Sequence, residues 1–199
     1  MQEETLLAAI DIGSNSFRLE IGKYVNGHIE PVECLKETVR LGGGLTPSEG
    51  LTAAAMDRGW ACLERFAERI RDFKPGFVRA VATQTLREAC NRAEFVATAR
   101  KILGVEVEVI AGQEEAMLIY HGVHQALPDS NERRLVIDIG GRSTEVICGV
   151  GSKVVDLDSF PVGSVSWSER YFPKGVLTRS RFNEAITAAK AVFEEAQAR

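Results

Sequence analysis

Two short segments of the chain place an aspartate, glycine and hydroxyl residues directly after an apolar run. The first reads Asp11-Ile-Gly-Ser-Asn-Ser16, and the second reads Asp138-Ile-Gly-Gly-Arg-Ser-Thr-Glu145. A glycine- and serine-rich turn after a buried strand can wrap a phosphate with backbone N–H groups and hydroxyls. A single turn of this kind is weak evidence, because an aspartate often just caps its own turn. Two matched copies favour a site in which two turns hold a phosphate chain and a cation.

The turns differ from the common nucleotide-binding loops. In a dinucleotide fingerprint or a Walker A loop the turn leads into a helix, whereas here each turn leads into a second strand pattern, at residues 17–24 and 146–150. The second turn also lacks the third glycine of the fingerprint, and the chain has no Gly-Lys-Ser/Thr sequence. Asp138 and Glu145 suit Mg²⁺, which prefers a few carboxylates together with water and phosphate oxygens.

Two other segments carry charged candidates. Ala111-Gly-Gln-Glu-Glu-Ala116 opens a helix pattern, where the helix dipole keeps a carboxylate ionised and able to act as a general base. The alternative is that Gly112 is the N-cap and Glu115 is a capping residue at the third helical position. Thr83-Gln-Thr-Leu-Arg-Glu-Ala89 follows a strand. Its Arg87 can clamp a phosphate with two hydrogen bonds, or can be a surface arginine paired with an acidic neighbour.

Strand and helix patterns alternate around these segments, and one unit occurs twice. The unit is a strand, an Asp-Ile-Gly turn, a strand, a hairpin, a strand and a helix, and it starts near Leu6 and again near Leu135. This indicates a duplication of subdomains. The second copy stops after its helices, so we expect one complete lobe over residues 1–126 and an incomplete lobe over 127–199.

The element patterns are as follows. Strands are predicted at residues 6–12, 17–24, 28–39, 77–82, 105–110, 135–139, 146–150 and 154–160, with Asn26-Gly27 as a hairpin turn. Helices are predicted at residues 52–73, 92–103, 112–127, from about 165, and at 179–198.

The composition is that of an ordinary globular protein. Of the 199 residues, 45% are hydrophobic and 26% are charged, which excludes disorder as the main state. The 24 basic and 28 acidic residues leave a net charge of −4, so no diffuse positive field exists to hold nucleic acid. No apolar run approaches the roughly 20 residues that span a bilayer, and the first residues are acidic where a signal peptide is basic. We therefore expect a cytoplasmic protein.

The cysteines and histidines give no metal pattern. The four cysteines form no Cys-x-x-Cys pair, and we expect reduced structural thiols. His121 and His124 lie three residues apart, but two ligands do not complete a zinc site, so a polar helix face is favoured.

Taken together, the segments 11–19, 82–89, 112–116, 138–145, 162–165 and 171–173 resemble the exopolyphosphatase / guanosine pentaphosphate phosphohydrolase family. The resemblance implies an α/β architecture, the actin-like ATPase (ribonuclease H-like) fold. It implies a bacterial, Mg²⁺-dependent hydrolase that releases the terminal phosphate of polyphosphate, or the 5′-γ-phosphate of guanosine pentaphosphate.

The resemblance also assigns roles by motif. The catalytic base falls in the pair Glu114 and Glu115, with Glu115 favoured, and Asp138 and Glu145 help to bind metal. The residues expected to contact the substrate phosphates are Asp11, Gly13, Ser14, Asn15, Ser16, Arg87, Gly140, Gly141, Arg142, Ser143 and Thr144.

Two departures from the family pattern are informative. Arg142 stands where the family has a third glycine, so it either strains a turn that prefers glycine or adds a cation for a long anion. The chain also ends before the remaining strands, helices and glycine-rich loop of the second lobe. The exposed sheet edge of an incomplete lobe leads us to expect a homodimer. The competing interpretations are an actin-fold kinase or ATPase, and a module that binds polyphosphate or a guanosine alarmone without turnover.

Overall fold

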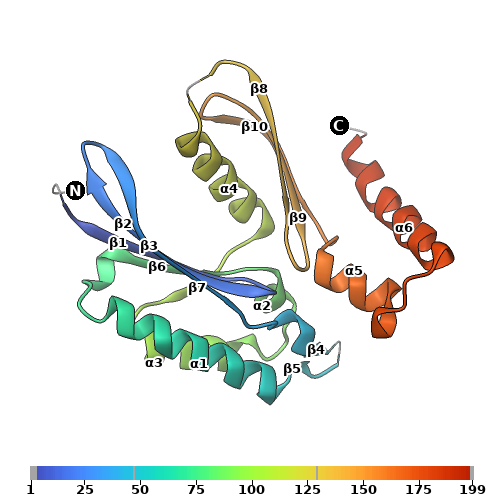
Figure 1. Ribbon diagram of the computed structural model, residues 1–199, viewed down its shortest axis with the longest axis horizontal. Helices are drawn as coiled ribbons and strands as arrows, with labels where there is room; N and C mark the ends of the chain where they lie inside the picture. The colour runs from blue at the N-terminus through green and yellow to red at the C-terminus, as the bar shows by residue number, and fades with distance from the viewer. Residues whose placement is uncertain (1–3, 47, 129, 198–199) are drawn as a thin grey trace. The chain divides into compact units, whose positions relative to one another are not determined.

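The computed structural model describes residues 4–46, 48–128 and 130–197 (Figure 1). The chain divides into two compact units with the boundary between Ile110 and Ala111. Each unit contains its own main sheet. Among the described residues, no helix is long and apolar enough to cross a membrane.

The first unit is built on a five-stranded sheet with the order β3-β2-β1-β6-β7. Strands β1 (Leu6–Ile12), β2 (Ser16–Val25) and β3 (His28–Thr38) form an antiparallel meander. Strands β6 (Val78–Ala82) and β7 (Val107–Val109) extend the sheet in parallel with β1. The predicted hairpin at Asn26-Gly27 is confirmed, and both residues have the positive φ that such a turn requires, 50° and 85°.

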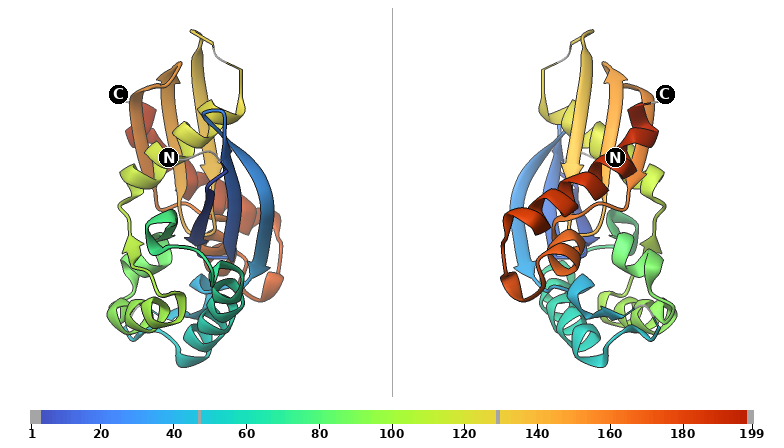
Figure 2. Two further views of the ribbon diagram at one scale, coloured as in Figure 1. Left: turned by 90° about the vertical axis from the view of Figure 1, so that its left-hand side faces the viewer. Right: turned by 90° about the vertical axis from the view of Figure 1, so that its right-hand side faces the viewer.

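Two long helices cover one face of this sheet, α1 (Ala53–Ile70) and α3 (Arg92–Leu103) (Figure 2). Helix α1 begins where predicted, because the Thr52 hydroxyl accepts a hydrogen bond from the Ala55 N–H at 3.4 Å. Its apolar stripe packs against the inward residues of β1 and β2 in one core. The smaller elements are η1 (Gly42–Gly44), β4 (Leu45–Thr46), β5 (Gly50–Leu51), η2 (Pro75–Phe77) and α2 (Gln84–Glu88).

The second unit has a three-stranded antiparallel sheet with the order β10-β9-β8. Its strands are β8 (Arg133–Ile139), β9 (Thr144–Val150) and β10 (Lys153–Phe160). Helix α4 (Gly112–Ala126) packs on one face. Helices α5 (Ser164–Tyr171) and α6 (Arg179–Gln197), with η3 (Pro173–Gly175) between them, follow β10.

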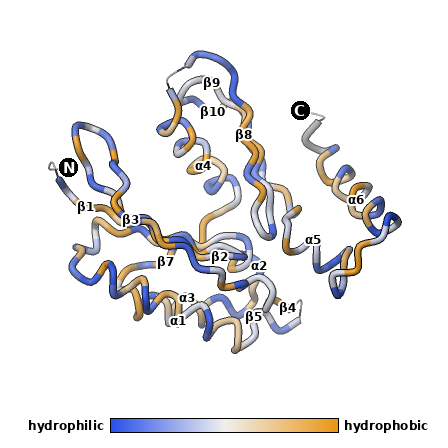
Figure 3. The backbone as a smooth tube through the Cα atoms, viewed as in Figure 1, coloured by the Kyte–Doolittle hydropathy of each residue, from blue (hydrophilic) through white to orange (hydrophobic). Residues whose placement is uncertain are grey.

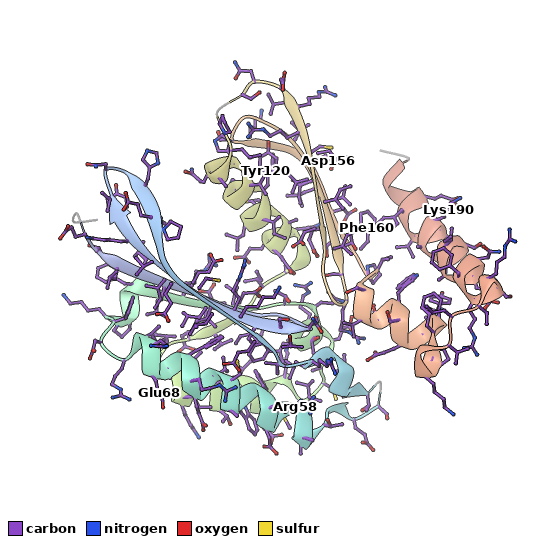
Figure 4. All side chains as sticks on the ribbon, in the orientation of Figure 1. Arg58, Glu68, Tyr120, Asp156, Phe160 and Lys190 are labelled. Carbon is purple, nitrogen blue, oxygen red and sulfur yellow. The ribbon has the colours of Figure 1, made fainter. Side chains whose placement is uncertain are left out.

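Tyr120 and Phe160 anchor the helices of this unit to the sheet from opposite sides (Figure 4). The Tyr120 hydroxyl of α4 donates a hydrogen bond to the Gly151 carbonyl oxygen at 2.9 Å. Phe160 of β10 packs on Phe193 of α6, with ring centroids 5.1 Å apart. Figures 1 and 2 accordingly show α4 and α6 on opposite faces of the sheet.

The predicted boundary between residues 126 and 127 is wrong, because α4 belongs to the second unit. Ala116 and Tyr120 of α4 are buried against Ile147 of β9. The sequence pattern of α4 identifies a helix but not the sheet on which that helix packs.

Most of the predicted elements are present. The helix predicted over residues 92–103 matches α3, and the one predicted over 52–73 ends at Ile70. Helix α2, which carries Arg87, was not predicted. The predicted end of the last helix at Ala198 and the first three residues of the acidic N-terminal segment lie outside the described residues.

Candidate functional site

The first Asp-Ile-Gly turn joins β1 to β2. Backbone hydrogen bonds from the segment that follows β3 hold it in place. The carbonyl oxygen of Ser14 accepts a hydrogen bond from Gly42 N–H at 2.8 Å. The carbonyl oxygen of Asn15 accepts hydrogen bonds from Val39 N–H at 3.1 Å and Arg40 N–H at 2.8 Å. Because donors already occupy these oxygens, the turn presents less negative charge to an approaching anion.

The second turn joins β8 to β9 and is held in the same way by the start of α5. The carbonyl oxygen of Gly140 accepts a hydrogen bond from Ser164 N–H at 3.0 Å. That of Gly141 accepts hydrogen bonds from Val165 N–H at 2.8 Å and Ser166 N–H at 3.1 Å. The first N–H groups of α5, which a helix leaves without intrahelical partners, thus hold the turn in place.

The first glycine of each turn is packed closely against a carbonyl oxygen three residues further along the chain. A Cβ on Gly13 would lie 2.7 Å from the carbonyl oxygen of Ser16, and a Cβ on Gly140 would lie 3.1 Å from that of Ser143. The equivalent glycine therefore meets the equivalent oxygen in both copies. This agreement supports the inferred duplication at atomic detail.

Arg142 does not have the strained backbone that its place in a glycine-rich turn suggested. Its φ is not positive, so no glycine-like conformation is forced on it. The side chain is only 16% exposed, and a guanidinium nitrogen lies 3.9 Å from a carboxylate oxygen of Glu169 in α5. The alternative in which Arg142 strains the turn is therefore wrong, and the side chain is directed to α5.

Gly163, at the N-cap of α5, lies directly against the backbone of the second turn. A Cβ at this position would lie 2.3 Å from the Arg142 nitrogen and 2.4 Å from its Cα. The Thr144 hydroxyl also donates a hydrogen bond to the Val162 carbonyl oxygen at 2.5 Å. The segment before α5 therefore packs closely against the second turn and holds it in place.

Asp138 and Glu145 are opposite each other in the β8–β9 ladder, so their side chains share one face of the sheet. Asp138 is exposed. Glu145 is 1% exposed, and its Oε1 accepts a hydrogen bond from the Ser159 hydroxyl at 2.7 Å. The sequence reasoning did not identify Ser159, although it faces Glu145 in the β9–β10 register.

The two glutamates of α4 occupy the third and fourth helical positions. The N-cap is Ala111, so Glu114 is the third helical residue and Glu115 the fourth. The capping position predicted for Glu115 therefore belongs to Glu114. Glu115 is half-buried, whereas Glu114 is exposed.

These glutamates lie at the same end of the second unit as its turn. Helix α4 has 15 residues and β8 has 7, which makes both elements about 22–23 Å long. Only residues 127–132 join them, so α4 and β8 run in opposite directions (Figure 1). The start of α4 therefore lies near the end of β8, where Asp138 is found.

Arg87 lies in the first unit and is held by its own surroundings. Its Nε and one NH2 nitrogen donate hydrogen bonds to Gln84 Oε1 at 2.9 and 2.7 Å. The other guanidinium nitrogen donates to the Ile110 carbonyl oxygen at 2.9 Å. The guanidinium is thus fixed in orientation, and Gln84 is a supporting residue that the sequence reasoning did not identify.

The candidate residues divide between the two units. The first turn and Arg87 are in the first unit, and the second turn, Glu114, Glu115, Asp138 and Glu145 are in the second. Among the residues that the structure describes, no group of three or more histidine, cysteine or acidic side chains is arranged to hold a metal ion.

The cysteines are all free thiols, as expected, but only Cys62 is buried. Cys34, Cys90 and Cys148 are exposed. The prediction that all four are structural is thus too broad.

The two sheets with their helices define a protein of the actin-like ATPase fold. PilM in the PilM–PilN type IV pilus biogenesis complex has the same fold, with a TM-score of 0.53 and 14% identity. The profile of the Ppx/GppA phosphatase family matches residues 21–199, and the chain belongs to this family.

Solved structures of this family are much more similar to the chain. An exopolyphosphatase-like protein is 31% identical with a TM-score of 0.91, over 98% of this chain and 62% of its own. The Aquifex aeolicus PPX-GPPA enzyme is 30% identical with a TM-score of 0.77, over 96% of this chain and 64% of its own. An exopolyphosphatase from Cytophaga hutchinsonii is 29% identical with a TM-score of 0.88, over 95% and 61%. The chain thus spans somewhat less than two thirds of the length of these relatives.

Proposed function

We propose that each Asp-Ile-Gly turn binds phosphates of inorganic polyphosphate and that the chain contributes to hydrolysis of its terminal phosphoanhydride. The observation that supports this most directly is the matched bracing of the two turns, in which the carbonyl oxygens of Ser14, Asn15, Gly140 and Gly141 are all occupied by backbone donors. Such turns suit a polyanion because they combine fixed geometry with little exposed negative charge. The exopolyphosphatase from Cytophaga hutchinsonii is a relative whose activity would fit this site.

Glu115 is the proposed general base. It would take a proton from a water whose oxygen attacks the terminal phosphorus, as the bond to the bridging oxygen breaks. The products are orthophosphate and a chain shortened by one phosphate. Phosphoryl transfer depends mainly on positioning and charge neutralisation, so a half-buried carboxylate in the first turns of α4 is a suitable partner for the water.

Asp138 and Glu145 fit a role in binding Mg²⁺, which keeps several waters and takes only one or two protein carboxylates beside substrate phosphates. Asp138 is the exposed member of the pair, so it would contact the ion. Glu145 is buried and accepts a hydrogen bond from Ser159, and it lies beside Asp138 on the same face of the sheet, so it would support the Asp138 carboxylate from the neighbouring strand. When bound, Mg²⁺ would neutralise charge on the phosphate oxygens.

Guanosine pentaphosphate carries the same terminal phosphoanhydride, so it is the alternative substrate. A third possibility is that the chain binds either polyanion without turnover. Phosphate release from each substrate, measured with Mg²⁺ and with EDTA, distinguishes the three. We expect Mg²⁺-dependent release from polyphosphate. Release from guanosine pentaphosphate alone would favour the alternative substrate, and tight binding without release would support a non-catalytic module.

A further inference from the structure

Arg40, in the segment that braces the first turn, has an uncommon backbone conformation. Its φ is 54°, in the left-handed region that residues with a Cβ rarely adopt. Its N–H and that of Val39 both donate to the Asn15 carbonyl oxygen, and Gly42 N–H donates to that of Ser14. Glycine and asparagine adopt a positive φ more readily, so the backbone alone gives no reason for an arginine at this position.

Arg58 of α1 holds the same two residues from their carbonyl side (Figure 4). Hydrophobic and hydrophilic residues alternate along this helix (Figure 3). Arg58 Nε donates a hydrogen bond to the Val39 carbonyl oxygen at 3.1 Å, and its Nη2 donates to that of Arg40 at 3.3 Å. Its Nη1 donates to the Ala54 carbonyl oxygen at 2.9 Å. The backbone of Arg40 is therefore fixed relative to the first turn through both its N–H and its C=O.

The charge of Arg40 is available beside a turn that has no cation of its own. The charged side chain of the turn is Asp11, and the polar residues after it are neutral. Arg18, which follows the turn in β2, forms an ion pair with Glu20 at 3.1 Å. Arg40 is exposed and pairs with no carboxylate of the described residues. Because its N–H lies 2.8 Å from the Asn15 oxygen, its side chain is long enough to reach a phosphate held by the turn.

We propose that Arg40 is a further phosphate-binding residue of the first turn. The inference rests on the proposed function, because it takes this turn as an element that binds a phosphate chain. The guanidinium donates two parallel hydrogen bonds to phosphate oxygens and neutralises part of their charge. The braced backbone fixes the start of the side chain, which reduces the conformational freedom lost on binding.

The test measures binding of imidodiphosphate, whose P–N–P bridge resists hydrolysis, by calorimetry on the full chain with Mg²⁺. Arg40→Gln removes the charge and should weaken binding about tenfold, because charge-assisted hydrogen bonds are lost. The loss should be greater at about 50 mM salt than at about 500 mM, where screening is stronger. Arg40→Lys keeps the charge without the paired geometry, so it should bind more tightly than Arg40→Gln.

Arg71→Gln is the matched control, because it removes the same charge from an exposed arginine at the C-cap of α1. Arg71 lies about 20 Å along the helix from Arg58, beyond the Debye length of about 10 Å at 0.1 M salt, so affinity should not change. Arg40→Gly separates binding from folding. Glycine adopts a positive φ without steric cost, so Tm should stay the same or rise while binding weakens as in Arg40→Gln.

The outcomes distinguish this inference from the proposed function. A wild-type chain that does not bind imidodiphosphate would overturn the proposed function and this inference with it. If the wild type binds, three results would overturn the assignment of Arg40 alone: unchanged affinity in Arg40→Gln, an equal loss in Arg71→Gln, or no tighter binding by Arg40→Lys than by Arg40→Gln. A lower Tm together with weaker binding in Arg40→Gly would also overturn it, because Arg40 would then support the turn without contacting phosphate.

Discussion

Glu37, Cys62 and Arg65 form a small polar cluster where β3 meets α1. Arg65 Nε donates a hydrogen bond to Glu37 Oε1 at 2.9 Å, and this contact lowers the pKa of the Glu37 carboxyl. Burial raises the pKa of the Cys62 thiol to about 12, with the Glu37 carboxylate adding to the effect. The cluster therefore holds one ionised carboxylate and one thiol that stays protonated.

The four thiols should differ in reactivity for this reason. We expect iodoacetamide at neutral pH to modify Cys34, Cys90 and Cys148, which are exposed, and to leave Cys62 unmodified, because the thiolate is the nucleophile. Peptide mass spectrometry measures the four sites separately. The same reaction in guanidinium chloride is the control and should modify all four. Equal labelling of Cys62 in the native protein would contradict the burial and protonation described here.

The Glu37–Arg65 pair should make stability depend on pH. The folded-state pKa of Glu37 lies below its ordinary value of 4.5. Its contribution is therefore fully present above about pH 5 and is lost as the pH falls through the folded-state pKa. We expect Glu37→Gln to lower the free energy of unfolding at pH 7 by up to about 1 kcal/mol, since the pair is partly exposed.

Urea titrations at pH 7 and pH 3 test this expectation. The difference between Glu37→Gln and the wild type should shrink at the lower pH. A pH-independent difference would mean that packing, rather than the ion pair, accounts for the effect.

The choice between the two glutamates of α4 can be tested directly in the catalytically active protein. Glu115→Gln keeps the shape of the side chain but removes the proposed base, so kcat should fall by about 10²–10⁴-fold with little change in substrate binding. Glu114→Gln, at the third helical position, is the matched control and should affect helix stability more than turnover. A greater loss of kcat in Glu114→Gln would reverse the assignment, and no loss in either variant would remove the general-base role.

At the scale of the elements, the contact between α5 and the second turn is the most specific feature. Gly163→Ala would place a methyl group 2.3 Å from the Arg142 backbone nitrogen, and neither backbone can yield easily. We expect the free energy of unfolding to fall by about 1–3 kcal/mol and binding of polyphosphate to weaken as the turn shifts. Thermal unfolding and equilibrium binding measure the two effects.

Gly122→Ala is the matched control for this substitution. Gly122 lies in α4, and an added Cβ meets no atom within 4 Å. The change should raise stability by about 0.5–1 kcal/mol, because alanine favours a helix interior. Equal effects of the two substitutions would show that Gly163 is not closely packed against the turn.

For the whole molecule, the two units should differ in stability. The first has a large core, with sheet and helices closed around it, whereas the buried residues of the main cluster in the second are Ala116, Tyr120 and Ile147. Less apolar burial means less free energy of folding, and a chain of two units need not unfold in one step.

The two tryptophans of the chain report on the units separately. Trp60 stacks on Phe95 in the first unit, and the Trp167 indole donates a hydrogen bond to the Ala185 carbonyl oxygen in the second. We expect Trp167 fluorescence, measured in Trp60→Phe, to change at lower urea concentration than Trp60 fluorescence, measured in Trp167→Phe. Coincident midpoints would show that the units unfold as one cooperative structure.

Local features of the molecule could be predicted from the sequence because they depend on neighbouring residues. The Asn26-Gly27 turn requires two positive φ angles, the cap at Thr52 needs a hydroxyl three residues before its donor, and the period of apolar residues specifies α1 and α3. The two Asp-Ile-Gly turns are recognisable for the same reason, since each is a continuous run of sequence that ends one strand and begins another.

The features that the sequence did not predict depend on contacts between residues far apart along the chain. Packing against Ile147 assigns α4 to the second unit. The Arg142 side chain is directed to α5 because Gly163 lies against the Arg142 backbone and Glu169 lies near its guanidinium. The burial of Glu145 beneath Ser159 depends on the register of β9 and β10. These features depend on which surfaces pack together in three dimensions, and the spacing of residues along the chain does not specify that packing.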